Sequence, residues 1–124
     1  MGKITTFTDL NTWKEAYKLV ILIYKYTDQF PSKEIYALVS QMRRSAVSVC
    51  SNIAEGFSRR TKKEKSQFYS ISSGSLTELQ NQIIISRGVG YIDKKDESIL
   101  LEQTVVVQKL IKGLVRGLEK IHNT

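Results

Sequence analysis

Side chains that carry out catalysis are sparse in this sequence. It contains one histidine, His122, and one cysteine, Cys50. A serine or cysteine nucleophile needs a base beside it, and we do not expect a histidine so near the end of the sequence to be held in a site. Metal sites need several histidine, cysteine or carboxylate ligands at short spacing, and the sequence has no such group. The sequence therefore predicts no catalytic residue, no metal, no cofactor and no enzymatic activity.

Three glutamates and the cysteine each allow two interpretations. Glu34, Glu55 and Glu78 could act as acid or base groups, but pairing with arginines or solvation of a helix face is favoured. Glu55 and Arg59 stand four residues apart, although a glycine lies between them. Cys50 lies in an apolar run, which favours a small buried side chain over a reactive thiol.

Positive charge is concentrated in one short part of the sequence. The net charge is +7, and residues 43–65 hold seven Lys or Arg against two Glu, a net of +5. Such an excess favours an anionic partner, namely nucleic acid, an acidic protein surface or a phospholipid face. Solvated side chains that only keep a small protein soluble are an equally supported alternative. The candidate nucleic-acid-binding residues are Arg43, Arg44, Arg59, Arg60, Lys62, Lys63 and Lys65.

These candidates fall into two groups. Those in residues 59–65 lie in a loop and at the start of the following helix, where unpaired backbone N–H groups also favour anions. Arg43 and Arg44 lie in the middle of a helix among apolar positions, where an unpaired charge is costly. We expect these two to line a polar channel or to pair with acidic residues of another subunit. Among anions, nucleic acid is favoured.

Four segments have the apolar spacing of helices, and none alternates like a strand for long. The expected helices cover residues 8–28, 32–55, 62–88 and 94–121. Four helices of this length, joined by short loops, predict an all-α fold. We expect an antiparallel up-down-up-down four-helix bundle that spans residues 1–124 as a single domain.

Capping signals and apolar stripes define the first helix and the ends of the second. Thr8 is a suitable N-cap for the first helix and Ser32, after Pro31, for the second. Gly56 is expected to end the second helix. The expected core stripe of the first helix consists of Leu10, Trp13, Tyr17, Val20, Tyr24 and Thr27.

The second helix is apolar on two sides. A helix of this kind must bury more than one face, so we expect one face to pack within the bundle and the other against another chain. The two expected stripes are Ile35, Leu38, Met42, Ala46, Val49 and Ile53, and beside them Tyr36, Val39, Val47, Cys50 and Ala54.

The later helices contain a capping box and several glycines. Thr61 and Glu64 match the capping box that starts a helix. Gly74 interrupts the third helix, and we expect it to mark a close helix crossing. Gly113 and Gly117 are expected to form a shallow groove for a neighbouring helix.

Four strings of the sequence are long enough to compare with known families. They are DLNTWKEAYKL (9–19), FPSKEIYALVSQMRRSAVSVCSNIAEG (30–56), GSLTELQNQ (74–82) and GYI (90–92). In these strings the sequence resembles the four-helix bundle family of bacterial 23S rRNA intervening-sequence proteins, which is often labelled as a ribosomal protein. The fourth helix matches only in its apolar pattern.

The resemblance implies a ring-shaped homopentamer with a basic surface around a central passage. The family is also similar to the accessory variability protein of diversity-generating retroelements, which binds nucleic acid and a reverse transcriptase. By position, the resemblance assigns an oligomer and motif role to Ser45, Ser48, Asn52, Glu55, Gly56, Gly74 and Glu78.

Two functions are therefore expected. The first is sequence-nonspecific binding of RNA or DNA by a basic homo-oligomer. The second is a protein-interaction scaffold that docks a nucleic-acid enzyme such as a reverse transcriptase. A single cysteine, and the lack of a signal segment or membrane span, favour a cytoplasmic protein without a membrane partner.

Overall fold

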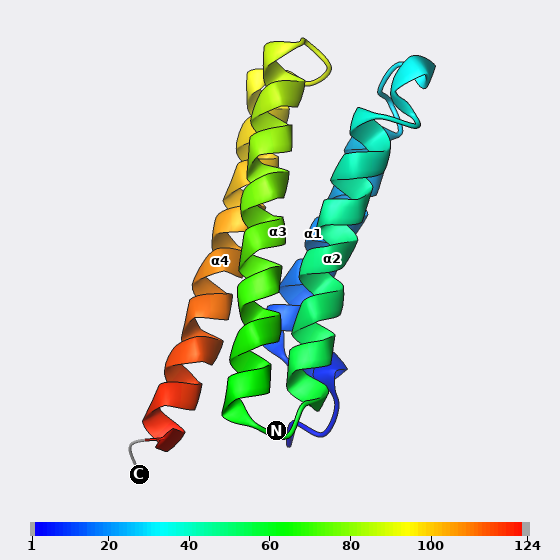
Figure 1. Cartoon of the computed structure of the whole chain (residues 1–124). Helices are drawn as coiled ribbons and strands as arrows, with labels where there is room; N and C mark the ends of the chain where they lie inside the picture. Colours follow the sequence, from blue (N-terminus) through cyan, green and yellow to red (C-terminus); the bar gives the residue numbers. More distant parts are fainter. Residues whose placement is uncertain (1, 123–124) are drawn as a thin grey trace.

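The computed structural model describes residues 2–122, with side chains through residue 119. This part of the chain contains α-helices and no strand, as an all-α fold requires (Figure 1). Two short 3-10 helices, η1 (Phe7–Asp9) and η2 (Ser32–Glu34), precede the first two α-helices. The four α-helices are α1 (Asn11–Thr27), α2 (Leu38–Ser58), α3 (Lys62–Gly88) and α4 (Lys94–His122).

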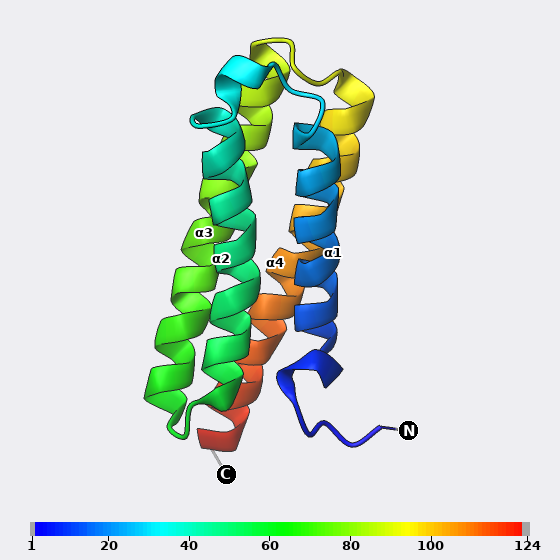
Figure 2. The ribbon, with the colours of Figure 1, turned by 90° about the vertical axis from the view of Figure 1, so that its right-hand side faces the viewer.

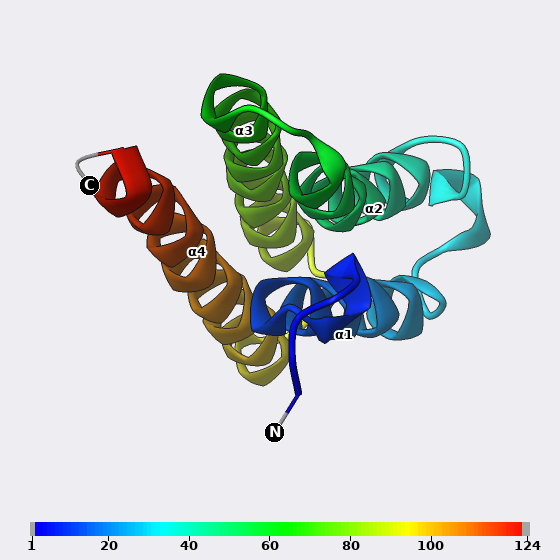
Figure 3. The ribbon, with the colours of Figure 1, turned by 90° about the horizontal axis from the view of Figure 1, so that it is seen from below.

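The helices surround one core in chain order. Seen from below, α1, α2, α3 and α4 follow one another around the bundle (Figure 3). Consistent with this, α2 packs against α1 and α3, and α4 packs against α3 and α1. The chain turns back at residues 59–61 at the lower end and at residues 89–93 at the upper end (Figures 1 and 2). The loop at residues 59–61 therefore lies at the same end as the last turns of α4.

The core is built from aliphatic side chains of all four helices. Burying each large one contributes about 1.5–3 kcal/mol. The stripe expected for α2 is confirmed from Met42 to Ile53, and α3 contributes Leu76, Leu79 and Ile83. In α4 the last buried residue is Ile111, and none of residues 112–119 is buried. The core also includes Ala16, Leu19, Ile23, Ala46, Val49, Leu100 and Val107.

The stripe expected for the first helix is wrong at its two tyrosines, whereas Leu10 and Thr27 are buried and Trp13 and Val20 pack against the core. Tyr17 and Tyr24 are 49% and 43% exposed, whereas α1 buries Ala16, Leu19 and Ile23. Both sets have helical spacing because α1 is apolar around more than half of its circumference. The aliphatic set lies in the core because the tyrosine hydroxyls keep access to water from the outer face.

The ends of the first two helices also differ from the expected ones. Thr8 does not cap α1, because residues 7–9 form a 3-10 turn in which the Asp9 carboxylate accepts from the N–H groups of Thr5 (2.9 Å) and Thr6 (3.0 Å). These bonds lower the pKa of Asp9. Ser32 starts the short η2 rather than α2, because Ala37 adopts φ −124° and ψ −106° and separates the two helices.

Tyr91 fastens the two loops at the upper end to each other. Its hydroxyl donates to Oε2 of Glu34 over 2.6 Å, and its ring packs against Phe30 with 5.2 Å between ring centroids. The preceding turn depends on Gly90, whose φ of +86° is readily adopted only by glycine. The loop after α3 is thereby joined to the segment that precedes α2.

We expect Tyr91→Phe to destabilise the protein at neutral pH and to matter less in acid. The Tyr91 hydroxyl, followed by the N–H of Leu38 and the charge of Lys33, holds the pKa of Glu34 below its usual value. A carboxylate with a lowered folded-state pKa stabilises the protein above its unfolded pKa, and this contribution is lost as the pH falls through the folded value.

Urea denaturation of the wild type and of Tyr91→Phe at several pH values measures this effect. The difference in the free energy of unfolding should shrink between about pH 6 and about pH 3, the range in which a glutamate with a lowered pKa titrates. A difference that stays constant over this range would show that the hydroxyl acts without Glu34.

Candidate nucleic-acid interface

The last turn of α2 packs closely on α3 at Gly56. A Cβ at this position would lie 2.5 Å from Cε1 and 2.9 Å from Cδ1 of Tyr69. Tyr69 is only 3% exposed, and burial raises the pKa of its hydroxyl. Gly56 therefore permits the close approach of two helices. The expectation that it ends the helix is wrong, since α2 continues to Ser58.

Lys65 closes the end of α2. Its ammonium donates to the carbonyl oxygens of Gly56 (3.2 Å) and Phe57 (2.7 Å) and lies 5.6 Å from the centre of the Phe57 ring. The last carbonyl groups of a helix lack partners within the helix, and a cation there is favourable. Lys65 thus holds α2 to α3 and has less capacity for an external anion than the sequence suggested.

Arg59 is also engaged within the chain. Its Nη2 donates to Oε2 of Glu55 over 3.0 Å, and its guanidinium lies 4.7 Å from the centre of the Phe68 ring. The glycine between Glu55 and Arg59 does not prevent this pair, because the helix passes through it. The favoured interpretation of Glu55, that it pairs with an arginine, is confirmed.

Three further cations, here called the loop cations, make no such contact with the described residues: Arg60, Lys62 and Lys63. None of them forms an ion pair with any described residue. Arg60 and Lys63 are exposed, and Lys62 is half-buried. They flank Thr61, which caps α3 by accepting from the N–H of Glu64 over 3.1 Å, as the capping box predicted. The loop cations therefore combine uncompensated charge with the start of a long helix, where anions are favoured.

Arg43 and Arg44 lie far from the loop cations. Arg44 precedes Arg59 by fifteen residues, which is about 22 Å along a helix axis. Arg44 donates to Oε2 of Glu78 over 3.0 Å. The favoured interpretation of Glu78, that it pairs with an arginine, is therefore confirmed. Arg43 donates to Thr27 over 3.0 Å and lies 4.5 Å from the centre of the Tyr24 ring.

These contacts correct the expectation that the paired arginines are buried among apolar positions. The Arg44 side chain is 53% exposed and that of Arg43 25% exposed, so neither is deeply buried. Each contacts acidic residues of its own chain, although the Arg43–Asp28 contact is long, at 4.0 Å. Pairing in trans is therefore not required to explain them, and the seven candidate cations do not form one patch.

A line of polar contacts, here called the α2–α3 polar seam, joins the second and third helices. Ser45 donates to Glu78 over 3.1 Å, and the Ser48 and Ser75 hydroxyls are 2.8 Å apart. Asn52 donates to the Ser48 carbonyl over 2.8 Å. Several residues expected to serve an oligomer are thus used inside the chain, where they hold α2 against α3.

At the other glycines where a close helix contact was expected, no neighbouring helix approaches within the described part of the chain. A Cβ at Gly74, Gly113 or Gly117 would meet no atom within 4 Å among the described residues. The expectation of a close crossing at Gly74 is therefore wrong within one chain. The expectation that Gly113 and Gly117 of α4 contact a neighbouring helix is also wrong within one chain.

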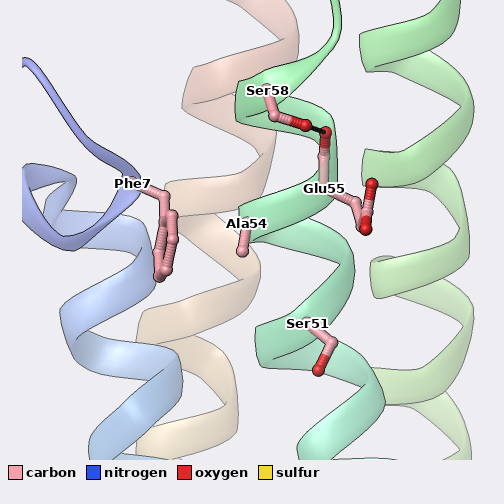
Figure 4. Close-up of a pocket in the computed structure, with 5 residues that line it drawn as sticks. All are labelled: Phe7, Ser51, Ala54, Glu55 and Ser58. Carbon is pink, nitrogen blue, oxygen red and sulfur yellow. Dashed lines mark hydrogen bonds between the residues drawn. The ribbon is translucent and has the colours of Figure 1, made fainter.

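A shallow hollow of about 360 Å³ lies where the N-terminal turn meets the last turns of α2 (Figure 4). Its lining offers one carboxylate and three small residues beside an aromatic ring, and Ser58 donates to the backbone carbonyl of Glu55 over 2.8 Å. Glu55 is already paired with Arg59. The hollow therefore presents no nucleophile beside a base. Its lining residues are Phe7, Ser51, Ala54, Glu55 and Ser58.

Residues with catalytic potential are otherwise isolated. Cys50 is buried, as expected for a small apolar side chain, and burial raises the pKa of its thiol to about 11. No group of three potential metal ligands occurs among the described residues. The side chain of His122 lies outside the described part. None of the helices in residues 2–122 is long and apolar enough to cross a membrane.

The structure adds Phe57, Phe68 and Tyr69 to the residues that shape this interface. They support Lys65, Arg59 and Gly56 across the turn between two helices. The sequence offered one usable signal, the four-residue spacing of Glu55 and Arg59. The aromatic contacts had none, because they depend on how α2 and α3 meet.

Comparison with known proteins decides the family. Residues 8–113 match the model of a family described as the 23S rRNA-intervening sequence protein. The chain belongs to this family. The resemblance seen in the four sequence strings is therefore confirmed for most of the chain.

A solved structure has the same fold as this family member. It is a protein of unknown function from the S23 ribosomal protein family of Bacteroides thetaiotaomicron VPI-5482, with a TM-score of 0.77. The similarity covers 85% of this chain and 95% of the other, at 13% sequence identity. At this identity the likeness shows the fold alone. No curated protein matches the chain.

Proposed function

We propose that the protein is a non-enzymatic, sequence-nonspecific RNA-binding protein of the cytoplasm. In this proposal the antiparallel bundle assembles into a homo-oligomer, a pentameric ring, and each subunit contributes its loop cations to binding. The observation that carries the proposal is that Arg60, Lys62 and Lys63 have no ion-pair partner among the described residues and surround the start of α3.

The composition of the loop favours a phosphate backbone over a small anion. Lysine and arginine side chains that neutralise phosphates supply sequence-independent affinity, because binding releases condensed counterions. The loop offers charge without a shaped pocket around it, which suits a polymer bound along its backbone. The family name refers to 23S rRNA, so RNA is the first polymer to test and DNA of the same length the second.

Self-association is supported by an apolar surface formed by α1, α2 and the turn that precedes α2. Tyr36 is 94% exposed, and Ile35, Tyr24 and Val47 are each at least 40% exposed. They surround Arg43 in a hollow of about 440 Å³. Part of the second face of α2 is already covered within the chain, because Val39 and Cys50 are buried. The remaining exposed part is the surface that we assign to a second copy, and light scattering measures the subunit number.

The proposal predicts that the variant Arg60→Glu, Lys62→Glu, Lys63→Glu binds RNA about tenfold more weakly or worse at moderate salt, since three phosphate contacts are removed. The helix tolerates these changes because acidic residues are favourable in the first turn. Arg59 and Lys65 stay unchanged, since they hold the end of α2. Fluorescence anisotropy with a labelled single-stranded RNA of random sequence measures the dissociation constant.

A matched control separates local charge from net charge. Lys14→Glu, Lys25→Glu, Lys33→Glu makes the same change in net charge on exposed residues outside the loop. This control should bind RNA nearly as well as the wild type. If both variants lose the same RNA affinity, binding depends on net charge alone. If the loop variant binds RNA as tightly as the wild type, the loop cations do not contact RNA.

A scaffold that docks a nucleic-acid enzyme, such as a reverse transcriptase, is the second candidate. It is favoured by an apolar hollow of about 600 Å³ on α4, where Val105 and Val106 are 39% and 40% exposed. A scaffold keeps its protein partner after nuclease treatment of the complex. An RNA-bridged association is lost under the same treatment.

A further inference from the structure

Three residues of α4, here called the α4 cations, form a second group of positive charges: Lys109, Lys112 and Arg116. All three are exposed, and none forms an ion pair with a described residue. Spacings of three and four residues place them on one face of the helix. Glu102 and Glu119 are also exposed on this face, so the three cations retain a local excess of positive charge.

Two contacts identify which edge of α4 faces which neighbouring helix. Glu97 lies 3.9 Å from Arg87 of α3, whereas Gln103 donates to the carbonyl of Glu15 of α1 over 2.9 Å. Lys112 follows Glu97 by fifteen residues, which places it about 60° around the helix, and Lys109 and Arg116 lie about 100–120° from Glu97 in the same direction, away from Gln103. The α4 cations therefore lie on the outer face of α4, on the side of α3.

The loop cation Lys62 lies on the matching edge of α3. Gln80 of α3 donates to Thr104 of α4 over 3.0 Å and so marks the edge that faces α4. Steps of seven residues back along α3 lead from Gln80 to Ser73 and Ser66, and Lys62 is one turn earlier. The first turns of α3 and the last turns of α4 lie at the same end of the bundle (Figures 1 and 3).

An open hollow of about 820 Å³ adjoins the loop cations on α3. It is lined by Lys63, Ser66, Gln67, Ser70 and Ile71. Serine hydroxyls and a glutamine amide are common donors to phosphate and sugar oxygens. Ile71 makes part of this hollow apolar, while its serine and glutamine side chains can donate hydrogen bonds to a nucleic-acid backbone.

We propose that the loop cations and the α4 cations form one RNA-binding surface. The phosphodiester backbone passes from the start of α3, along the serine-lined hollow, to the last turns of α4. This inference rests on the proposed function, because it extends the RNA surface from the loop to a second helix. It also predicts that RNA contacts more phosphates per subunit than the loop alone can supply.

The face of α4 suits a polyanion rather than a membrane. A helix that lies on a lipid surface carries large apolar side chains beside its cations. Beyond the partly exposed Val105 and Val106, the exposed residues of α4 from 109 to 119 include no large apolar side chain. They are Lys109, Lys112, Gly113, Arg116 and Glu119.

The test compares three full-length variants by fluorescence anisotropy with the same single-stranded RNA at several salt concentrations. The α4 variant is Lys109→Gln, Lys112→Gln, Arg116→Gln. The loop variant is Arg60→Gln, Lys62→Gln, Lys63→Gln. The control is Lys14→Gln, Lys25→Gln, Lys33→Gln, which removes the same charge from exposed positions elsewhere. Glutamine is a good helix former, and circular dichroism checks that α4 is retained.

We expect the α4 variant to weaken RNA binding about tenfold and to reduce the slope of log K against log salt by about 2, because each contact to single-stranded phosphate contributes about 0.7. Combining the α4 and loop changes should weaken binding more than either alone. The control should keep the wild-type slope.

Other results overturn the inference. If the α4 variant has the same dissociation constant and salt slope as the control, α4 does not contact RNA and the inference is wrong. In that case, loss of binding in the loop variant still supports the proposed function. A wild type that binds no RNA overturns both. An α4 variant with altered subunit number places these residues in a subunit interface. Loss of binding only to vesicles of anionic lipid, with RNA binding intact, assigns the cations to a membrane.

Discussion

Ile83→Ala will lower the free energy of unfolding by about 3 kcal/mol, the largest stability effect expected of any single change discussed here. Ile83 of α3 is 0% exposed and packs in the core against the other helices. Truncation removes apolar burial and leaves a cavity that the neighbouring side chains fill only in part. In thermal unfolding, the midpoint should fall by on the order of 10 °C for a chain of this size.

The adjacent Ile84 provides a matched control, because it has the same side chain on the same helix and is 52% exposed. Ile84→Ala should change the free energy of unfolding by less than about 0.5 kcal/mol, as is usual for surface substitutions. Both variants must be compared at one protein concentration, since self-association shifts apparent stability. Equal effects of the two substitutions would contradict the orientation of α3.

Gly56→Ala is expected to destabilise the protein by about 1 kcal/mol, although alanine is the better helix former. The new Cβ would lie 2.5 Å from Cε1 of Tyr69, and this ring is 3% exposed and enclosed by the core. Overpacking at such a site costs about 1–3 kcal/mol, which outweighs a helix-propensity gain of about 1 kcal/mol. Urea denaturation measures the net effect.

Gly74→Ala is the matched control on the neighbouring helix. A Cβ there meets no atom within 4 Å, so only the helix propensity changes and the protein should become more stable by about 0.5–1 kcal/mol. Stabilisation by Gly56→Ala would show that Tyr69 moves aside easily. A lower subunit number for Gly74→Ala than for the wild type would instead place Gly74 in a subunit contact.

Much of the fold was predictable because local signals agreed with packing. The capping box at Thr61 and the apolar spacing from Leu76 to Ile83 located α3, despite the serine-rich stretch in its first half. The core stripe of α1 was not predictable from spacing, because two overlapping stripes fit the helical period equally well. Only the partner helices decide which of them is covered.

The candidate interface was predictable in part, because charge density along the sequence identifies a basic segment but not its partners. Lys65 and Arg59 belong to that segment, yet their contacts with the end of α2, Glu55 and aromatic rings use them within the chain. Conversely, charge density along the sequence does not reveal Lys112 and Arg116, because uncharged residues separate them. They are recognised only when the positions on one helix face are viewed together.

Between residues 112 and 119, α4 has no fully buried side chain and packs on the core only through the partly buried Leu114, Val115 and Leu118, so this second part is held less firmly than the first. Backbone amides in the second part should exchange with deuterium through local opening, well before global unfolding exposes those near Leu100. A polymer bound across Lys112 and Arg116 must therefore offset the entropy lost when these turns become rigid. Its affinity will depend on the stiffness of the helix as well as on the number of its charges.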